Sequence, residues 1–141
     1  MSPARRARSR SFRRRRGATL VEAALVFLVF AVLIAGIMEL GVIGFAANAI
    51  TFSAHRAARF GSLRGSASGH AASQADIQAS ARSFAAPLNP ANLTVAVTWL
   101  PDNQPGSSVQ VTVSYSLRPS VLPLSPSVLT LQSTARQRIA Q

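Results

Sequence analysis

The feature that most constrains this chain is a long, unbroken apolar run. Every position from Ala23 to Met38 is apolar, and after Glu39 another eight apolar residues follow, Leu40–Ala47. As a helix, the stretch 23–47 would be about 37 Å long, and the hydrocarbon core of a bilayer is about 30 Å thick. A chain of 141 residues has little core with which to surround a rod that is apolar on every side. The run therefore predicts one membrane-crossing helix.

Two glutamates flank the central part of this run. Glu22 and Glu39 would lie about 25 Å apart along a helix, so that each can sit near one membrane interface. A carboxylate costs much less there than at the bilayer centre. The two acids are therefore compatible with a crossing helix, and Glu39 is a candidate acid for packing within the membrane.

Positive charge is concentrated in front of the run. The chain has a formal net charge of +11, and eight of its fifteen basic residues, all arginines, fall within residues 1–16. The positive-inside rule then predicts a cytoplasmic N-terminus, with Arg13, Arg14, Arg15 and Arg16 as the topology signal and the rest of the chain outside. Phosphate binding by this arginine run is the alternative, but no nucleic-acid fold motif or aromatic platform accompanies it. We expect no nucleic-acid partner.

Beyond the membrane the helix is expected to continue through 48–64. A second short helix is expected over 74–86, with Ile77, Ala81 and Phe84 on one face, before Pro87 stops it. The small residues of the helix continuation form a stripe at helical spacing: Ala47, Ile50, Ala54, Ala57 or Ala58, and Gly61.

The last third of the chain alternates with the period of a strand. Residues 93–99 and 109–117 each place apolar side chains at every second position, and the turn residues 101–106 separate them. They predict an antiparallel hairpin, and 128–139 predicts a third, weaker strand. The expected fold class is α+β: a single-pass membrane protein with one long N-terminal helix and a small extracytoplasmic module that has a short antiparallel β-sheet. Its expected parts are a basic leader (1–17), a transmembrane helix (18–47), a helix continuation with a Gly/Ser linker (48–69) and the module (70–141).

The residues outside the membrane offer little for catalysis. The chain has no cysteine, and the part after residue 47 has two acids, Asp76 and Asp102, and two histidines, His55 and His70. Neither a metal-ligand spacing nor a nucleophile–base–acid order stands out among them. We therefore expect no enzyme activity, no cofactor, no metal and no small-molecule substrate.

The motif that carries information lies between the leader and the helix. Gly17 follows four arginines, a small residue, Ala18, comes next, and Glu22 stands five positions after the glycine at the head of the apolar run. This order is that of a prepilin-type processing site. Cleavage after Gly17 would free the α-amine of Ala18, which Glu22 of the same or a neighbouring chain could neutralise in an apolar environment.

These segments together resemble the TadE-like pseudopilins, or minor pilins, of tight-adherence (Flp-type IV) pilus systems. The resemblance rests on RRGATLVEAALV (15–26), AGIMELG (35–41), NAITFSAHRAARFG (48–61) and the late hairpin with its Pro-rich continuation. It implies cleavage after Gly17 by a prepilin peptidase, and a role in assembling an adhesive pilus. It also implies partnership with other pilin subunits and the assembly machinery, a place in the bacterial inner membrane, and a second acid at the position of Glu39.

Three other interpretations remain open from the residues alone. An uncleaved single-pass anchor would present an extracytoplasmic protein-binding module and would have no need of Glu22. A secreted domain would be released by a signal peptidase near residues 46–49, and a nucleic-acid binder would act through residues 1–16.

Overall fold

A computed structural model describes the backbone of residues 9–118 and 128–140, and the side chains of 17–118 and 128–140. The longest element is helix α1, Ser9–Ser62, with 54 residues. The chain divides into two compact units at Met38 and Glu39, and α1 supplies residues to both. The Pro-rich segment 119–127 and the first eight residues of the basic leader lie outside the described residues.

The part of α1 in the N-terminal unit is apolar and exposed. Side chains from Gly17 to Ile34 are all exposed, among them Phe27 (72%) and Phe30 (58%). The helix over Gly17–Ser62 is long and apolar enough to cross a membrane, with a mean hydropathy of 2.8 in its most apolar window. The expected long, apolar N-terminal helix is confirmed.

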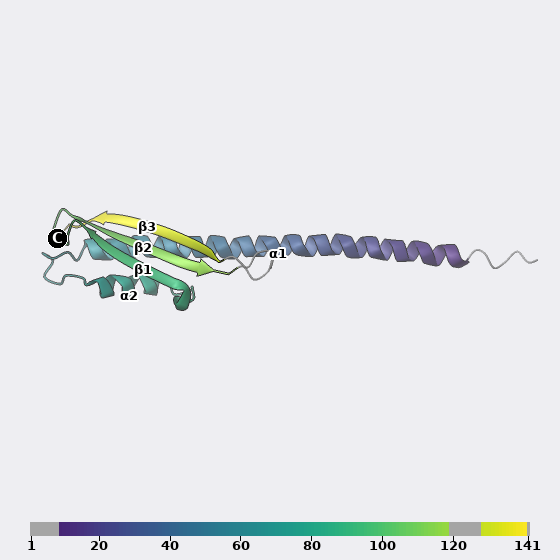
Figure 1. Ribbon diagram of the computed structural model, residues 1–141, viewed down its shortest axis with the longest axis horizontal. Helices are drawn as coiled ribbons and strands as arrows, with labels where there is room; N and C mark the ends of the chain where they lie inside the picture. Colours follow the sequence, from purple (N-terminus) through teal and green to yellow (C-terminus); the bar gives the residue numbers. More distant parts are fainter. Residues whose placement is uncertain (1–8, 119–127, 141) are drawn as a thin grey trace, which may run out of the picture. The chain divides into compact units, whose positions relative to one another are not determined.

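The C-terminal unit contains a small antiparallel sheet (Figure 1). Its strands are β1 (Leu93–Leu100), β2 (Ser108–Leu117) and β3 (Leu129–Arg138), in the order β1-β2-β3. Leu93 pairs with Tyr115, and Leu117 pairs with Leu129. The predicted hairpin and the third strand are therefore confirmed, and with them the α+β fold class.

One face of the sheet is covered by helices. The inward side chains of β1 and β2, such as Val97 and Val111, are buried together with the C-terminal part of α1 and with α2 (Gln74–Phe84). A 3-10 turn, η1 (Pro90–Asn92), leads from α2 into β1. The outward side chains of β1 are exposed, so the core is one layer between helices and sheet.

Small residues allow α1 to lie close to its neighbours. Ala54, Ala57 and Ala58 are fully buried, and Ser53 donates a hydrogen bond of 2.6 Å to the carbonyl of Ala81 in α2. The predicted stripe is confirmed at Ile50 and beyond. At its start, the buried residues of this face are Ala46 (1% exposed) and Ile50, while Ala47 is half-buried.

Helix α2 differs from the expectation in its end and at one residue. It ends at Phe84, with Ala85 as its C-cap, rather than at residue 86. Ile77 and Ala81 are buried as predicted, but Phe84 is 39% exposed, so its predicted place on the buried face is wrong. Ala85, at the C-cap, is 1% exposed and takes the inner position, because the next residue on the Ile77–Ala81 line lies four positions on.

Candidate functional site

The predicted processing site lies on α1. Gly17 and Ala18 both have helical backbone and are exposed, and Arg13–Arg16 precede them in the same helix. The side chains of these arginines lie outside the described residues. A Cβ atom placed on Gly17 would have nothing within 4 Å, and Gly17 does not have a positive φ. Neither packing nor backbone conformation within the described chain therefore requires glycine at this position.

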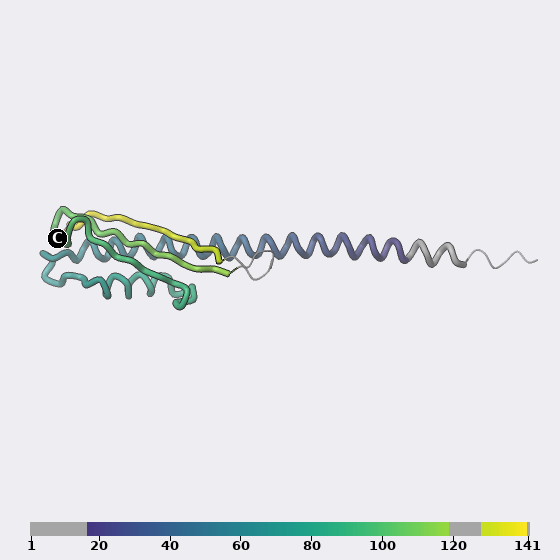
Figure 2. Tube along the Cα trace, in the orientation of Figure 1, coloured from purple at the N-terminus to yellow at the C-terminus, as the bar shows by residue number. Residues whose placement is uncertain are grey.

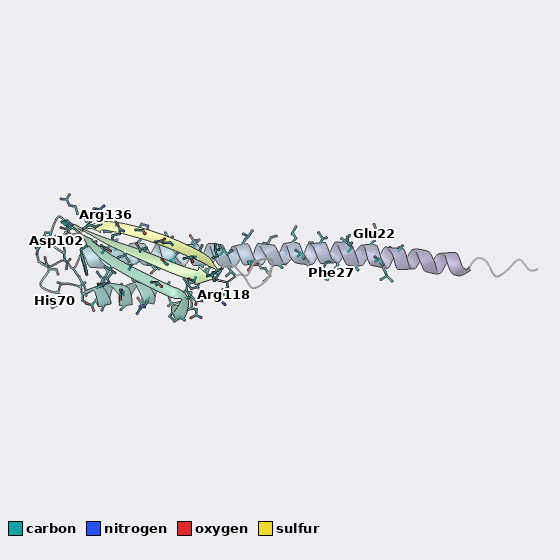
Figure 3. All side chains as sticks on the ribbon, in the orientation of Figure 1. Glu22, Phe27, His70, Asp102, Arg118 and Arg136 are labelled. Carbon is teal, nitrogen blue, oxygen red and sulfur yellow. The ribbon has the colours of Figure 1, made fainter. Side chains whose placement is uncertain are left out.

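Glu22 lies on an open face of the same helix (Figure 3). Its side chain is exposed, and around it are the apolar side chains of Ala23, Val26 and Phe30 together with Thr19. In a membrane, the surface of α1 around Glu22 would combine apolar side chains with one negative charge. Such a surface suits a second apolar segment that brings a positive charge with it.

Glu39, the second candidate acid, is placed differently. It is half-buried, it interacts within the chain, and it is the first residue of the C-terminal unit. The structure therefore does not bring Glu22 and Glu39 into one site.

A cluster that sequence reasoning did not find lies in the C-terminal unit, between α1 and α2. The rings of Phe52 and Phe84 meet edge to face with their centroids 6.0 Å apart. The guanidinium of Arg56 lies 5.1 Å from the Phe52 ring centroid and 5.9 Å from that of Phe84, which are cation–π distances. A groove of about 360 Å³ adjoins them, lined by Arg56, Arg59, Phe60, Leu63, Ser80, Ser83 and Phe84. The i, i+4 spacing of Phe52 and Arg56 was the available signal.

The two acids outside α1 serve local structure. Ser73 and Asp76 form a capping box at the start of α2, and the hydrogen bonds from the Ser73 hydroxyl and backbone lower the pKa of Asp76 below 3.8. In the β1–β2 turn, a 2.5 Å hydrogen bond from the Ser107 hydroxyl and another from the Gln104 backbone lower the pKa of Asp102.

The histidines do not converge with these acids into a metal site. His55 is exposed on α1, and His70 is exposed in the loop between α1 and α2. Within residues 9–118 and 128–140, no three His, Asp or Glu side chains are grouped so as to hold a metal ion.

A long apolar helix whose C-terminal part packs with α2 on a small antiparallel sheet defines an α+β, single-pass membrane architecture. Residues 17–59 match the model of the TadE-like protein family, which confirms the resemblance drawn from the sequence. The match associates the chain with tight-adherence pili and with a membrane. Neither a curated protein nor a solved structure matches the chain.

Proposed function

We propose that this chain is a pseudopilin that acts in assembly of a tight-adherence pilus after a prepilin peptidase has cleaved it behind Gly17. The observation that carries the proposal is the extent of the family match. It begins at Gly17 itself and runs through the apolar helix to Arg59, so residues 1–16 are outside the match and the candidate processing site is its first residue.

The surroundings of Gly17 support a role in recognition by another protein. Glycine within a helix costs roughly 1 kcal/mol relative to alanine. Other glycines of α1 have structural or membrane explanations: Gly61 is packed against side chains, and Gly41 and Gly44 lie in the apolar stretch, where small residues suit helix contacts. Gly17 lies between arginines and a carboxylate, and its open surroundings leave its backbone accessible to a peptidase.

The mature N-terminus would complete the site at Glu22. Cleavage would turn Ala18 into a terminal residue with a free α-amine, about one helical turn from Glu22. In an apolar environment an ammonium and a carboxylate that pair are far less costly than either alone. We propose that Glu22 docks the subunit by accepting this charge from the N-terminus of an adjacent pilin or pseudopilin.

The membrane boundaries are part of the same proposal. The leader 1–17 would be cytoplasmic in the inner membrane, and the C-terminal unit extracytoplasmic. Because Ala46 is buried in the protein core, we propose that the lipid-embedded stretch ends between Glu39 and Ala46, a few residues before position 47. The interval 18–40 would be about 34 Å long as a helix, which still crosses the hydrocarbon core.

A second function is favoured by one observation. Helix α1 is continuous from Ser9 through Gly17, so the end of the leader and the membrane helix form one element. An uncleaved single-pass anchor that presents an extracytoplasmic protein-binding module would keep this continuity and would retain its arginines.

The first experiment determines the N-terminus of the protein isolated from membranes of its native host, by intact mass and end sequencing. The proposal expects a start at Ala18 in the wild type and an uncleaved chain for Gly17→Leu. Gly41→Leu is the matched control, because position 41 lies on the same helix and is equally open; this variant should be cleaved normally. A wild-type start at residue 1 or 2 would instead establish the anchor.

The second experiment separates processing from docking. Glu22→Ala should be cleaved as efficiently as the wild type, whereas pilus output should fall at least about tenfold, because the N-terminal charge loses its partner in an apolar layer. Glu22→Asp, which keeps the charge, should retain part of the output. Wild-type pilus output from Glu22→Ala would refute the docking role.

A further inference from the structure

The helices and strands of the C-terminal unit run between two ends (Figure 2). The side chains at these two ends differ. At the far end, the Ala140 backbone N–H donates to the Ser62 carbonyl, and the Ser66 N–H donates to the Asn103 carbonyl. At the opposite end, which we call the apolar end, α1 continues back toward Leu40, and Leu117 at the end of β2 pairs with Leu129 at the start of β3.

Exposed apolar side chains gather at the apolar end. Val128, which precedes β3, and Leu129, the first residue of β3, lie there, whereas Phe52 and Phe84 meet between the two ends of the unit. Outside residues 40–45, the described part of the C-terminal unit has five large exposed apolar side chains. Of these five, Leu63 is the one that lies at the far end. The five exposed fractions are Phe52 50%, Leu63 55%, Phe84 39%, Val128 45% and Leu129 38%.

Outside α1 the acids of the unit lie at one end, whereas cations lie at both, since Arg136 and Arg138 at the end of β3 belong to the far end. The acids Asp76 and Asp102 both lie at the far end, in the first turn of α2 and in the β1–β2 turn. The exposed Arg118 directly follows β2 at the apolar end. A cation therefore adjoins the aliphatic residues there, and the two carboxylates lie at the opposite end of the unit.

The end of β2 packs on the same core as the N-terminal part of α1 within this unit, since Leu117 lies against the buried cluster that contains Ala46. Val109 adjoins Gly61, since a Cβ on Gly61 would lie 3.3 Å from Val109 Cγ2. From Val109 to Leu117 a strand rises about 26 Å, which equals about 17 helical residues and reaches the level of Gly44. Figure 1 shows β2 and β3 extending along α1 beyond the end of α2. At this level α1 exposes Phe45 (55%) and Val42 (55%).

We propose that the tip surface, formed by Leu117, Arg118, Val128 and Leu129, rests in the headgroup layer of a bilayer that contains anionic phospholipid. Its aliphatic side chains continue the apolar surface of α1, and a long arginine side chain reaches a phosphate while its stem stays in apolar contact. Anionic lipid attracts such a cation at the membrane surface.

A polar pocket beside Arg118 fits the phosphate of such a lipid. The pocket has a volume of about 650 Å³, and Arg118 lines it together with the amides of Asn89 and Asn92 and the hydroxyl of Ser116. Guanidinium, amide and hydroxyl groups all donate hydrogen bonds to phosphate oxygens. Val128 also lines the pocket, so phosphate donors and an apolar contact adjoin at one place.

The inference rests on the proposed membrane insertion of α1 but not on cleavage, and one fluorescence experiment tests it. Trp99 is the chain's single tryptophan, so the full chain carrying Trp99→Phe provides a silent background. Phe30→Trp then reports insertion of α1, Val128→Trp reports the tip surface, and Leu63→Trp is the matched exposed site at the far end. Each variant is reconstituted into vesicles of phosphatidylcholine and phosphatidylglycerol whose acyl chains are brominated close to the headgroup.

The expected result is strong quenching for Phe30→Trp and quenching for Val128→Trp at least about twofold greater than for Leu63→Trp, because bromine quenches only nearby indoles at the interface. Adding Arg118→Glu, or omitting phosphatidylglycerol, should lower the Val128→Trp quenching toward the Leu63→Trp value. Far-UV circular dichroism verifies folding of each variant.

The other outcomes separate the two proposals. Quenching of Phe30→Trp with equal, weak quenching at positions 128 and 63 would overturn the tip surface and leave membrane insertion standing. No quenching of Phe30→Trp would overturn the insertion itself. Strong quenching of Val128→Trp that neither Arg118→Glu nor neutral lipid reduces would overturn the role of anionic lipid.

Discussion

Gly61 of α1 lies so close to Ile77 of α2 that a Cβ atom at position 61 would stand 2.9 Å from Ile77 Cδ1. Ile77 is fully buried, and Val109 of β2 closes the space from the other side at 3.3 Å. One hydrogen atom at position 61 thus sets how closely the two helices and the sheet approach one another.

The first prediction concerns this contact. Gly61→Val should lower the free energy of unfolding of the C-terminal unit by about 3 kcal/mol, because overpacking a filled core forces side chains or backbone to shift. Thermal unfolding in detergent, followed by the emission of Trp99, measures the change.

The control for Gly61 removes the atom that clashes. Ile77→Val deletes the Cδ1 methyl group, so Gly61→Ala should cost less in the Ile77→Val background than in the wild type, with a coupling of about 1 kcal/mol. Additive effects of Gly61→Ala and Ile77→Val would contradict the close contact.

The second prediction concerns the buried hydroxyl of Ser53. Ser53→Ala should destabilise the unit by about 1 kcal/mol, because the 2.6 Å hydrogen bond to the Ala81 carbonyl is lost. The loss is limited, since that carbonyl also accepts from the Ala85 N–H. Thr51→Ala is the matched control, because its hydroxyl bonds the Ala47 carbonyl on an exposed face. Equal losses of stability for Ser53→Ala and Thr51→Ala in urea unfolding would refute the contribution of the buried hydrogen bond.

The third prediction concerns acid. The pKa of Asp76 is lower in the folded chain than its ordinary value of 3.8, so the unfolded chain binds the proton more readily. The stability from the capping box is therefore fully present above about pH 4 and is lost as the pH falls through the folded pKa. Unfolding measured from pH 7 down to pH 2 should show a smaller acid loss for Asp76→Ala than for the wild type. Parallel curves would contradict this assignment.

The fourth prediction concerns the cluster of Phe52, Arg56 and Phe84. Arg56→Ala and Phe84→Ala should be coupled by about 0.5–1 kcal/mol, because the guanidinium lies over the ring at a partly exposed site. Arg82→Ala, on the exposed side of α2, should show no coupling to Phe84→Ala. Double-mutant cycles from chemical denaturation measure both couplings.

Periodicity was sufficient to predict most of the fold. The alternation in 93–99 and 109–117 gave both the hairpin and the faces of its strands, because a strand has only two faces and one is buried here. It failed at Phe84. In a helix of 11 residues both Phe84 and Ala85 lie near the line through Ile77 and Ala81, and the narrow space beneath the sheet admits the smaller side chain.

The candidate sites also differ in whether the sequence alone could predict them. The order of Gly17, Ala18 and Glu22 is local, because all three residues fall within six consecutive positions, and a pattern that short is visible in the sequence. The cluster at Arg56 needs a side chain from α2 that is close only in three dimensions. The position of the tip surface depends on how far β2 extends along α1. The sequence pattern of neither segment predicts this, because it is set by how the two segments pack in three dimensions.

The use of α1 as a core element also determines when the C-terminal unit can fold. Ala54 and Ala57 of α1 leave the ribosome long before β3, yet Ala135 of β3 and Ile139, which follows β3, belong to the same buried cluster. The small-residue face of the helix therefore stays uncovered until almost the whole of the unit has been synthesised. If the unit is extracytoplasmic, as proposed, its folding would report complete translocation, because a chain halted before β3 would leave this face open.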